Sequence, residues 1–391
     1  MRFMTVLGLV VLVAASANAG GPGIRVRVTN PLDAARPTES VEVTAAALAG
    51  QAAPADLARL TVTDARTGHE VLSQAVDEDG DGAFDLLVFQ ADFAPGEARE
   101  FVLSVAEPRK PRREDYRVYA RFVRERQDDF AWENDRVAFR IYGPALETFA
   151  KEPLTSSTVD AWCKRTRRLV LNDWYLVDDY HRDHGEGGDF YSAGRSRGCG
   201  GSGLIVDGAL AVSKNFRSSR VLASGPLRVV FEVSYPEWEK PGLKVTEVKR
   251  VTLDAGSHFN RFESFYTTDG DVTWAAGIRE AKGVVPRVDR QRGVVRTWEH
   301  LTNYGDNGWL GCGLVVEPAA IVDVREEAGN QLVVARTPRG QPATWYAGSG
   351  WDRSGDFPDV AAWDRYLEEF ARRLASPLKI EIFMRTAGTA S

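Results

Sequence analysis

Short apolar runs interrupted by polar residues dominate the chain and predict β-strands. Residues 24–29 alternate strictly between aliphatic and polar side chains, the pattern of a strand with one buried face. Further strands are expected at 60–63, 71–76, 84–90 and 100–105, with Gly- and Asp-rich turns between several of them. Closely spaced short strands with such turns predict a small β-sandwich over residues 20–108.

A stretch rich in proline and charge, residues 107–114, predicts a linker to a second and larger domain, residues 115–391. Strands recur throughout that domain, and many of them alternate. They are expected at 137–142, 204–206, 229–233, 245–253, 259–266, 319–324, 331–336, 344–347 and 378–383. We therefore predict an all-β protein, in which the large domain is an antiparallel β-sandwich.

One segment departs from the strand pattern. Residues 359–375 carry an apolar stripe at helical spacing, with Asp359 as a potential N-cap and Pro377 as a stop signal. The stripe predicts a single amphipathic helix near the C-terminus, packed on the core through Trp363, Tyr366, Leu367, Phe370 and Leu374.

The first 19 residues have the pattern of an export signal. Arg2 precedes an apolar run, residues 6–15, that is too short to span a membrane comfortably, and Ala17-Asn18-Ala19 has the form of a cleavage site. We expect cleavage near Ala19 and a periplasmic or extracellular protein. No later stretch is long and apolar enough for a membrane anchor.

Charge and cysteine content narrow the possible partners. The formal net charge is −6, without a basic stripe, which disfavours binding to nucleic acid. Three cysteines allow at most one internal disulfide, and Cys199–Cys312 is the pair we expect because both lie in glycine-rich contexts, expected to be loops. Their spacing matches no zinc motif.

Residues 178–191 concentrate the groups that could do chemistry. They include two of the five histidines, His181 and His184, with Tyr180 and Glu186, among glycines that favour a loop. Imidazoles near carboxylates are suited to general acid/base catalysis, so these four residues are the predicted catalytic groups. The alternatives are a divalent metal site and a loop that is merely ordered by hydrogen bonds.

Neighbouring residues could bind an acidic sugar. Arg195 and Arg197 could hold a carboxylate through paired hydrogen bonds, and Tyr191 could contact the same substrate. Lyase chemistry on uronates needs such a cation, a base at C5 and an acid at the leaving oxygen. Hydrolysis would instead need two carboxylates, which the sequence cannot select from Glu133, Asp135, Glu186, Asp189, Glu263 and Glu280.

Aromatic and acidic residues suggest two further sites. Among ten tryptophans, Trp309 and Trp351 lie beside glycines and are the predicted sugar-stacking residues. Asp77, Asp79 and Asp81 followed by Gly82 are similar to the start of a calcium loop, although the twelfth position lacks the usual glutamate. A structural calcium is one interpretation of this segment, an acidic hairpin turn is the other, and no cofactor is required.

Four longer motifs carry a resemblance to a known family. They are residues 132–144, 181–187, 197–201 and 253–257. Together they resemble a bacterial domain-of-unknown-function family often encoded beside polysaccharide-degrading enzymes. The resemblance covers about residues 115–385 and the Asp-Gly-Asp-Gly turn of the small domain. It implies a galactose-mutarotase-like β-supersandwich and a role linked to sugars, but no catalytic residues.

The sequence therefore predicts an exported enzyme that cleaves glycosidic bonds in acidic, uronate-containing poly- or oligosaccharides, by β-elimination or hydrolysis. A non-catalytic carbohydrate-binding protein, or an epimerase or mutarotase, is the alternative compatible with the same residues.

Overall fold

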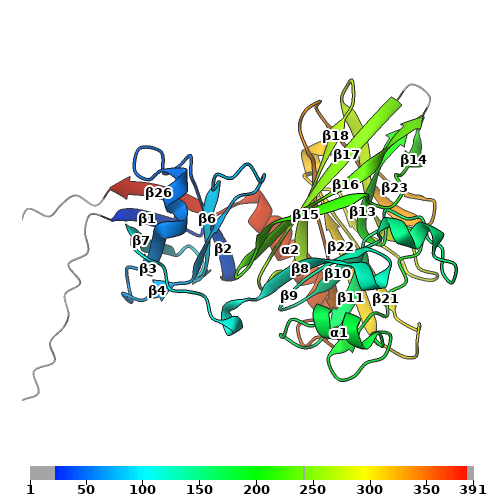
Figure 1. Ribbon diagram of the computed structural model, residues 1–391, viewed down its shortest axis with the longest axis horizontal. Coiled ribbons are helices and arrows are strands. Elements are labelled where there is room, and N and C mark those ends of the chain that lie inside the picture. The colour runs from blue at the N-terminus through cyan, green and yellow to red at the C-terminus, as the bar shows by residue number, and fades with distance from the viewer. Residues whose placement is uncertain (1–22, 241–242, 385–391) are drawn as a thin grey trace, which may run out of the picture.

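The computed structural model describes residues 23–240 and 243–384, and its two β-rich parts lie side by side along the long axis of the molecule (Figure 1). The predicted signal peptide and its cleavage site lie outside the described residues. The protein is mostly β, with antiparallel sheets and a helix near the C-terminus, as the alternation of apolar residues predicts.

Two antiparallel sheets form the small domain. One has the order β26-β1-β7-β3-β4 and the other β2-β6-β5, with valines, leucines and phenylalanines buried between them. The elements are β1 (Ile24–Thr29), β2 (Arg36–Thr44), η1 (Pro54–Arg59), β3 (Leu60–Asp64), β4 (Glu70–Val71), β5 (Ser73–Val76), β6 (Leu86–Phe93), β7 (Ala98–Val105) and β26 (Lys379–Met384).

The last strand changes the predicted domain division. The sequence assigns residues 115–391 to the large domain, but β26 pairs with β1 along its whole length, from Ile24 opposite Met384 to Thr29 opposite Lys379. Ile380 and Ile382 pack against the small domain's core. The chain thus leaves the small domain once and returns to close the edge of its sheet, as Figure 1 shows.

The large domain contains three further sheets. Their orders are β12-β11-β10-β9-β8, β14-β13-β19-β24-β23 and β15-β16-β17-β18-β25-β22-β21-β20. The bounds are η2 (Arg113–Asp115), β8 (Val118–Val123), η3 (Arg124–Arg126), β9 (Asp129–Asn134), β10 (Ala138–Ile141), η4 (Pro144–Thr148), β11 (Asp160–Lys164), α1 (Leu171–Val177), β12 (Gly187–Gly188), β13 (Cys199–Val206), β14 (Ala209–Ala211), β15 (Ser218–Ser224), β16 (Arg228–Lys240), β17 (Leu243–Asp254), β18 (Phe259–Thr267), β19 (Val272–Arg279), β20 (Arg287–Asp289), β21 (Val294–His300), β22 (Trp309–Val315), η5 (Pro318–Ala320), β23 (Ile321–Glu327), β24 (Asn330–Thr337), β25 (Ala343–Trp351) and α2 (Val360–Ala375). One large apolar cluster joins the three sheets.

The predicted helix is α2, and its N-cap is the predicted one. The Asp359 side chain accepts a hydrogen bond from the backbone N–H of Ala362 at 2.7 Å. Trp363 and Leu367 pack on β22 over Gly311 and Gly313, where a Cβ atom would lie 2.5 Å and 2.7 Å from these side chains. Glycine therefore allows the helix to approach the sheet closely.

These glycines also explain why two predicted loops are strands. Cys312 lies in β22 and Cys199 begins β13, where a Cβ on Gly200 would lie 2.2 Å from the Cβ of Ala347. Glycine in these strands accommodates packing against neighbours. The predicted Cys199–Cys312 disulfide is not formed: Cys163, Cys199 and Cys312 are all free thiols in the structure.

A buried ion network connects the two domains. Arg228 on β16 donates to Asp254 at 2.6 and 2.8 Å and lies 2.5 Å from Glu42 of the small domain. Gln74 of the small domain accepts hydrogen bonds from the backbone N–H groups of residues 227 and 228. Burial raises the pKa of Asp254, but the Arg228 guanidinium outweighs it and holds that pKa below its usual range.

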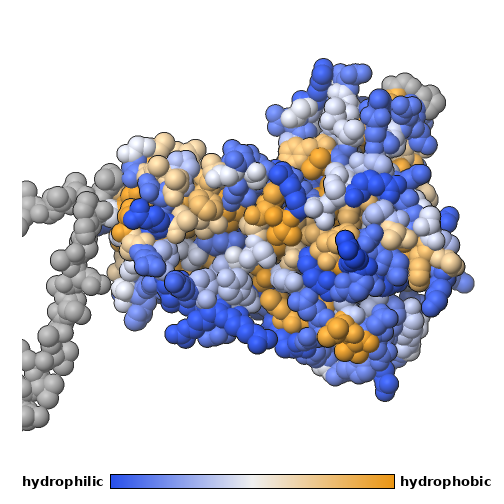
Figure 2. Space-filling model, viewed as in Figure 1, coloured by the Kyte–Doolittle hydropathy of each residue, from blue (hydrophilic) through white to orange (hydrophobic). Residues whose placement is uncertain are grey.

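The visible face is largely polar, with apolar patches, one of them over α1 (Figure 2). Leu176 and Val177 at the end of that helix are exposed. Within residues 23–240 and 243–384, none of the helices has the length and hydropathy needed to span a bilayer.

Substituting Arg228 tests the interdomain network. Arg228→Ala leaves the Asp254 carboxylate, which is only 20% exposed, without its partner, and we expect the free energy of unfolding to fall by about 3–5 kcal/mol. Arg287→Ala is the matched control, since Arg287 pairs with Asp364 and Glu368 near the surface, and should cost about 1 kcal/mol or less. Urea unfolding measures both. Equal losses would contradict a special role for Arg228.

Candidate functional site

The segment 178–191 contributes the edge strand β12 to the sheet β12-β11-β10-β9-β8, and its other residues cover one face of that sheet. The strand registers give this sheet two unlike faces. Phe139 and its partners Trp132 and Ala161 lie on the side that joins the main core. Arg140 and its partner Asp160 lie on the opposite side, under α1 and the loop that follows it. The loop therefore covers a layer of buried charged side chains.

Arg140 is the centre of this layer. Its guanidinium lies 2.9 Å from Asp160, 2.7 Å from Asp189 and 3.5 Å from Asp129, and all four side chains are buried. Asp129 belongs to β9 and Asp160 to β11, the two strands that flank β10 with Arg140, whereas Asp189 comes from the loop itself. Three carboxylates thus share one guanidinium, which fastens the loop to the sheet.

The excess of carboxylates changes their protonation. Burial raises the pKa of Asp129 to about 6, in spite of the opposing effect of Arg140. Burial also raises the pKa values of Asp160 and Asp189, and the negative charge of Asp160 raises the pKa of Asp189 further. Oxygen Oδ1 of both Asp129 and Asp160 has no hydrogen-bond partner within the described protein. The excess of carboxylates therefore favours protonated carboxyl groups in this layer.

A second ion pair fixes the start of the covering segment. Glu133 accepts from the backbone N–H groups of Val170 and Leu171 at the N-terminus of α1, at 2.7 and 2.8 Å, and lies 2.7 Å from the ammonium of Lys164. The positive end of the helix and the lysine together compensate this buried carboxylate. The geometry fixes α1, and the loop begins directly after it at Asp178, whose φ is 55°.

His181 is the loop residue placed at the boundary between this layer and solvent. Its Nδ1 lies 2.9 Å from the backbone oxygen of Asp189, which can only accept, so Nδ1 carries the proton and Nε2 keeps its lone pair. The side chain is 38% exposed and stacks on Tyr304, with ring centroids 4.3 Å apart. Burial lowers the pKa of His181, which favours the neutral imidazole.

Two further groups complete the surroundings of His181. Arg126 donates from Nε to the hydroxyl of Tyr180 at 2.8 Å and pairs with the exposed Glu152 at 3.2 Å. Tyr304 is 67% exposed, and its pKa is raised by burial of the phenol and by Asp189, so it keeps its proton. A neutral imidazole, a guanidinium and a protonated phenol are thus gathered where two loops meet.

The other two predicted catalytic residues have different partners. His184 is exposed, and its Nε2 lies 2.8 Å from the exposed Asp179. Glu186 accepts two hydrogen bonds from Arg168, at 2.9 and 2.6 Å, which hold its pKa below the usual range. Tyr180 is nearly buried, with its hydroxyl directed at Arg126.

The predicted substrate arginines do not join this site. Arg195 is exposed, and Arg197 is buried, donating to the backbone oxygens of Ser157 and Ser202 at 3.1 and 3.2 Å. Burial lowers the pKa of Arg197 to about 10. Within the described residues neither arginine makes a hydrogen bond to His181 or His184. Tyr191 is also buried, so Arg197 and Tyr191 support the fold and are inaccessible to a polymer.

The structure separates the two predicted stacking tryptophans. Trp309 is 42% exposed and stacks on His300 at 4.9 Å, on the hairpin that also carries Tyr304. Trp351 is 2% exposed, and its Nε1 donates to the backbone oxygen of Asn307 at 2.7 Å. Only Trp309 is available to a sugar ring, because Trp351 is enclosed by its neighbours.

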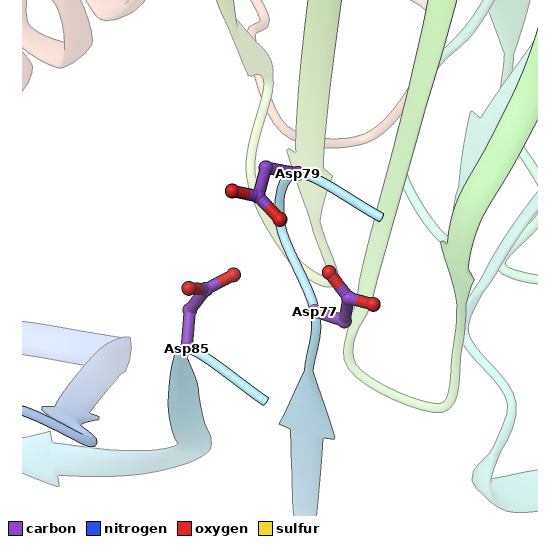
Figure 3. A group of neighbouring side chains, drawn as sticks. All are labelled: Asp77, Asp79 and Asp85. Carbon is purple, nitrogen blue, oxygen red and sulfur yellow. The ribbon is translucent and has the colours of Figure 1, made fainter. Parts of the chain in front are cut away.

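Three carboxylates converge at the acidic turn of the small domain (Figure 3). Oxygens of Asp77, Asp79 and Asp85 lie within 4.8 Å of one another, whereas the predicted third ligand, Asp81, is not part of the group. Asp77 already accepts from the backbone of Gly80 and Gly82 at 2.6 and 2.9 Å. These three aspartates are the residues of the described chain that could hold a hard cation such as calcium.

Several residues of the candidate site were not predicted from the sequence. Arg140 and Asp160 each lie within a short apolar strand, and a charged residue in such a strand is a signal that could have identified them. Arg126 and Tyr304 lie 55 residues before and 123 residues after His181 in the sequence, and no local pattern connects them to it.

The sequence matches a protein family and a relative that are both without an assigned function. The profile of the family described as "Domain of unknown function (DUF4861)" matches residues 28–380. A relative from Formosa agariphila, "Uncharacterized protein P7", is 32% identical over 373 residues, covering 91% of this chain and 93% of its own.

Solved structures show the fold. A chain from Enterococcus faecalis, titled as a protein in glycosyl hydrolase family 38, superposes with a TM-score of 0.51 at 11% identity, covering 94% of this chain. This chain spans about half of that one, 48% of its length. An α-mannosidase from the same species gives a TM-score of 0.45 at 11% identity, over 94% of this chain and 46% of its own. The fold of this chain thus resembles about half of the chain titled as a glycosyl hydrolase family 38 protein.

Asp129→Asn tests the excess of carboxylates around Arg140. The folded pKa of Asp129 lies above its unfolded value, so wild-type stability is lost as pH rises from about 4 to about 6. The variant lacks this loss, and its free energy of unfolding should gain about 2 kcal/mol on wild type between pH 4 and pH 8. Urea unfolding at several pH values measures it. Asp207→Asn, at an exposed turn, is the control, and a pH-independent difference for Asp129→Asn would refute the argument.

Proposed function

This chain belongs to the family described as domain of unknown function (DUF4861), and we propose that it is an enzyme cleaving glycosidic bonds in acidic, uronate-containing saccharides. The observation that carries the proposal is the half-exposed His181, whose Nδ1 is engaged by a backbone oxygen and whose ring stacks on Tyr304, next to Tyr180, which accepts from Arg126. The likeness of the fold to part of a glycosyl hydrolase supports a carbohydrate substrate.

We favour β-elimination at this surface. Nε2 of His181 would remove the proton at C5 of a uronate, while a guanidinium neutralises the carboxylate and so makes that proton more acidic. The electron pair forms the C4–C5 double bond as the bond from C4 to the leaving oxygen breaks. Tyr304 would protonate that oxygen. Arg126 is the proposed cation, taking the role that the sequence assigns to Arg195 or Arg197.

Buried carboxylates favour this chemistry in a second way. An imidazolium formed by proton abstraction would lie beside the carboxylate layer around Arg140, where negative charge is in excess; Oδ2 of Asp189 lies 3.7 Å from Nδ1 of His181. His181 would thus receive the proton on Nε2 while the backbone oxygen of Asp189 orients its ring from Nδ1. A base oriented by a third group in this way is the usual arrangement for an activated base. Hydrolysis remains the alternative, and it would need a second accessible carboxylate, whereas Asp129, Asp160 and Asp189 are sealed against Arg140.

A carbohydrate-binding protein without catalysis is the second candidate. The exposed Trp309, stacked on His300, favours it, because such a surface can hold a sugar ring without any bond being broken. An epimerase or mutarotase uses the same acid/base groups and is the third. In all three, the partner is a poly- or oligosaccharide outside the cytoplasm, in keeping with the predicted export signal.

Replacing the proposed base tests the enzyme. His181→Ala should lower kcat/KM on uronate oligosaccharides by about 10²- to 10⁴-fold, the contribution typical of a general base, while binding measured by calorimetry is retained. Product analysis for a 4,5-unsaturated uronate, or for new reducing ends only, decides between elimination and hydrolysis. His69→Ala in the small domain is the matched control. Wild-type binding without turnover on any uronate polymer would favour the binding protein.

The pH profile tests the assigned roles separately. Because burial lowers the pKa of His181, the acid limb of kcat/KM should lie below the ordinary histidine value of about 6.5. Because the pKa of Tyr304 is raised, the alkaline limb should lie above about 10. Tyr304→Phe should remove the alkaline limb that belongs to the phenol. An acid limb clearly above 6.5 would exclude His181 as the base.

A further inference from the structure

A small cavity lies on the same sheet face as Arg140, beyond Trp162. It is lined by Arg136, Lys164, His258, Trp162, Trp351, Ser349, Ser354, Val137 and Leu310, and it has room for about one water-sized particle. All of these side chains except Arg136 are buried. The cavity is too small for a sugar ring, which separates it from the surface around His181.

The polar groups that line the cavity are cations, N–H donors and two serine hydroxyls, without any carboxylate. Lys164 is compensated by Glu133 at 2.7 Å. Asp356 is shared between Arg136 and Arg167, both at 2.8 Å, and lies 3.3 Å from His258. Even with His258 left out of the count, the three cations Lys164, Arg136 and Arg167 face two carboxylates, so the surroundings carry an excess of positive charge.

Two residues of the lining each have a buried donor without an acceptor in the described protein. These donors are Nε1 of Trp162 and Nε of Arg136. Lys164 uses two of its three ammonium protons, on Glu133 and on the backbone oxygen of Asn134, both at 2.7 Å. A buried donor without an acceptor costs about 1–3 kcal/mol, and here two such donors and a spare ammonium proton belong to side chains that line one small space.

The geometry points to a binding site for a small monovalent anion of about the size of chloride, held by Trp162, Arg136 and Lys164. An anion only accepts hydrogen bonds, which suits a space lined by unused donors and an excess of positive charge. A water molecule would satisfy the same donors, but it would leave the charge excess uncompensated and bring two donors of its own. The site would fix the edge of β11 and the Trp162 ring, which stacks on Tyr180 at 5.1 Å.

Bromide replaces chloride as a probe that can be seen directly. Crystals of the full chain grown or soaked in sodium bromide should show an anomalous peak within hydrogen-bonding distance of Trp162 Nε1 and Lys164 Nζ. In solution, replacing sodium gluconate by sodium chloride at constant ionic strength should raise the Tm by about 2 °C, because gluconate is too large to enter. Neither measurement depends on catalysis, so it can succeed or fail independently of the proposed enzyme.

Trp162→Phe removes the N–H while it keeps an aromatic ring, and it should weaken the chloride effect on Tm at least fivefold. Trp309→Phe makes the same change at an exposed position and should leave the effect intact. If Trp162→Phe does not fold, Arg136→Gln, at the partly exposed edge of the cavity, provides the second variant. The absence of a bromide peak, or equal chloride effects in Trp162→Phe and wild type, would show that the cavity holds water and overturn the proposal.

Discussion

The sharing of one buried guanidinium by three carboxylates is the constraint on which the candidate site depends. A charge enclosed in protein must be compensated locally, because removal from water costs several kcal/mol per ion. Asp189 of the loop joins Asp129 and Asp160 in compensating Arg140, and in that position it presents its backbone oxygen to His181. One residue thus anchors the loop through its side chain and orients the proposed base through its main chain. The loop is positioned by electrostatics, in contrast to α2, which packs through an apolar stripe.

The parts of the fold that depend on local pattern were predictable. Alternation identified many strands, and the spacing of apolar residues with Asp359 identified α2. Pairing between distant segments was not predictable: nothing in residues 379–384 indicates that they close the small domain's sheet against β1. The glycine-rich segments around Cys199 and Cys312 were misassigned as loops, because their glycines accommodate Ala347, Trp363 and Leu367, which lie far away in the sequence.

In the candidate site, too, the local sequence identified the segment, but it could not identify the contacts with residues distant in the sequence. Composition marked residues 178–191 as chemically important, but it could not distinguish His181 from His184 three positions later. His181 stacks on Tyr304 above the buried ion layer, whereas His184 pairs with the exposed Asp179. Arg195 and Arg197 were chosen because they are close in sequence, whereas the guanidinium beside Tyr180 belongs to Arg126, 54 residues away. Proximity in a β-sheet is decided by register, which a single sequence does not reveal.

The face of β11 carries Asp160, Trp162 and Lys164 in turn, and the charge imbalance changes sign along it. Negative charge is in excess around Asp160, and positive charge is in excess around the cavity beside Lys164. These imbalances cannot cancel each other. Four residues of strand separate the two ends by about 13 Å, where two unit charges attract by only about 1 kcal/mol at an effective dielectric constant of about 20. That is less than the cost of leaving either charge uncompensated. Each charge excess must therefore be compensated where it lies. Around Asp160, protonation of a carboxyl group would reduce the negative charge, and beside Lys164 the proposed anion would reduce the positive charge.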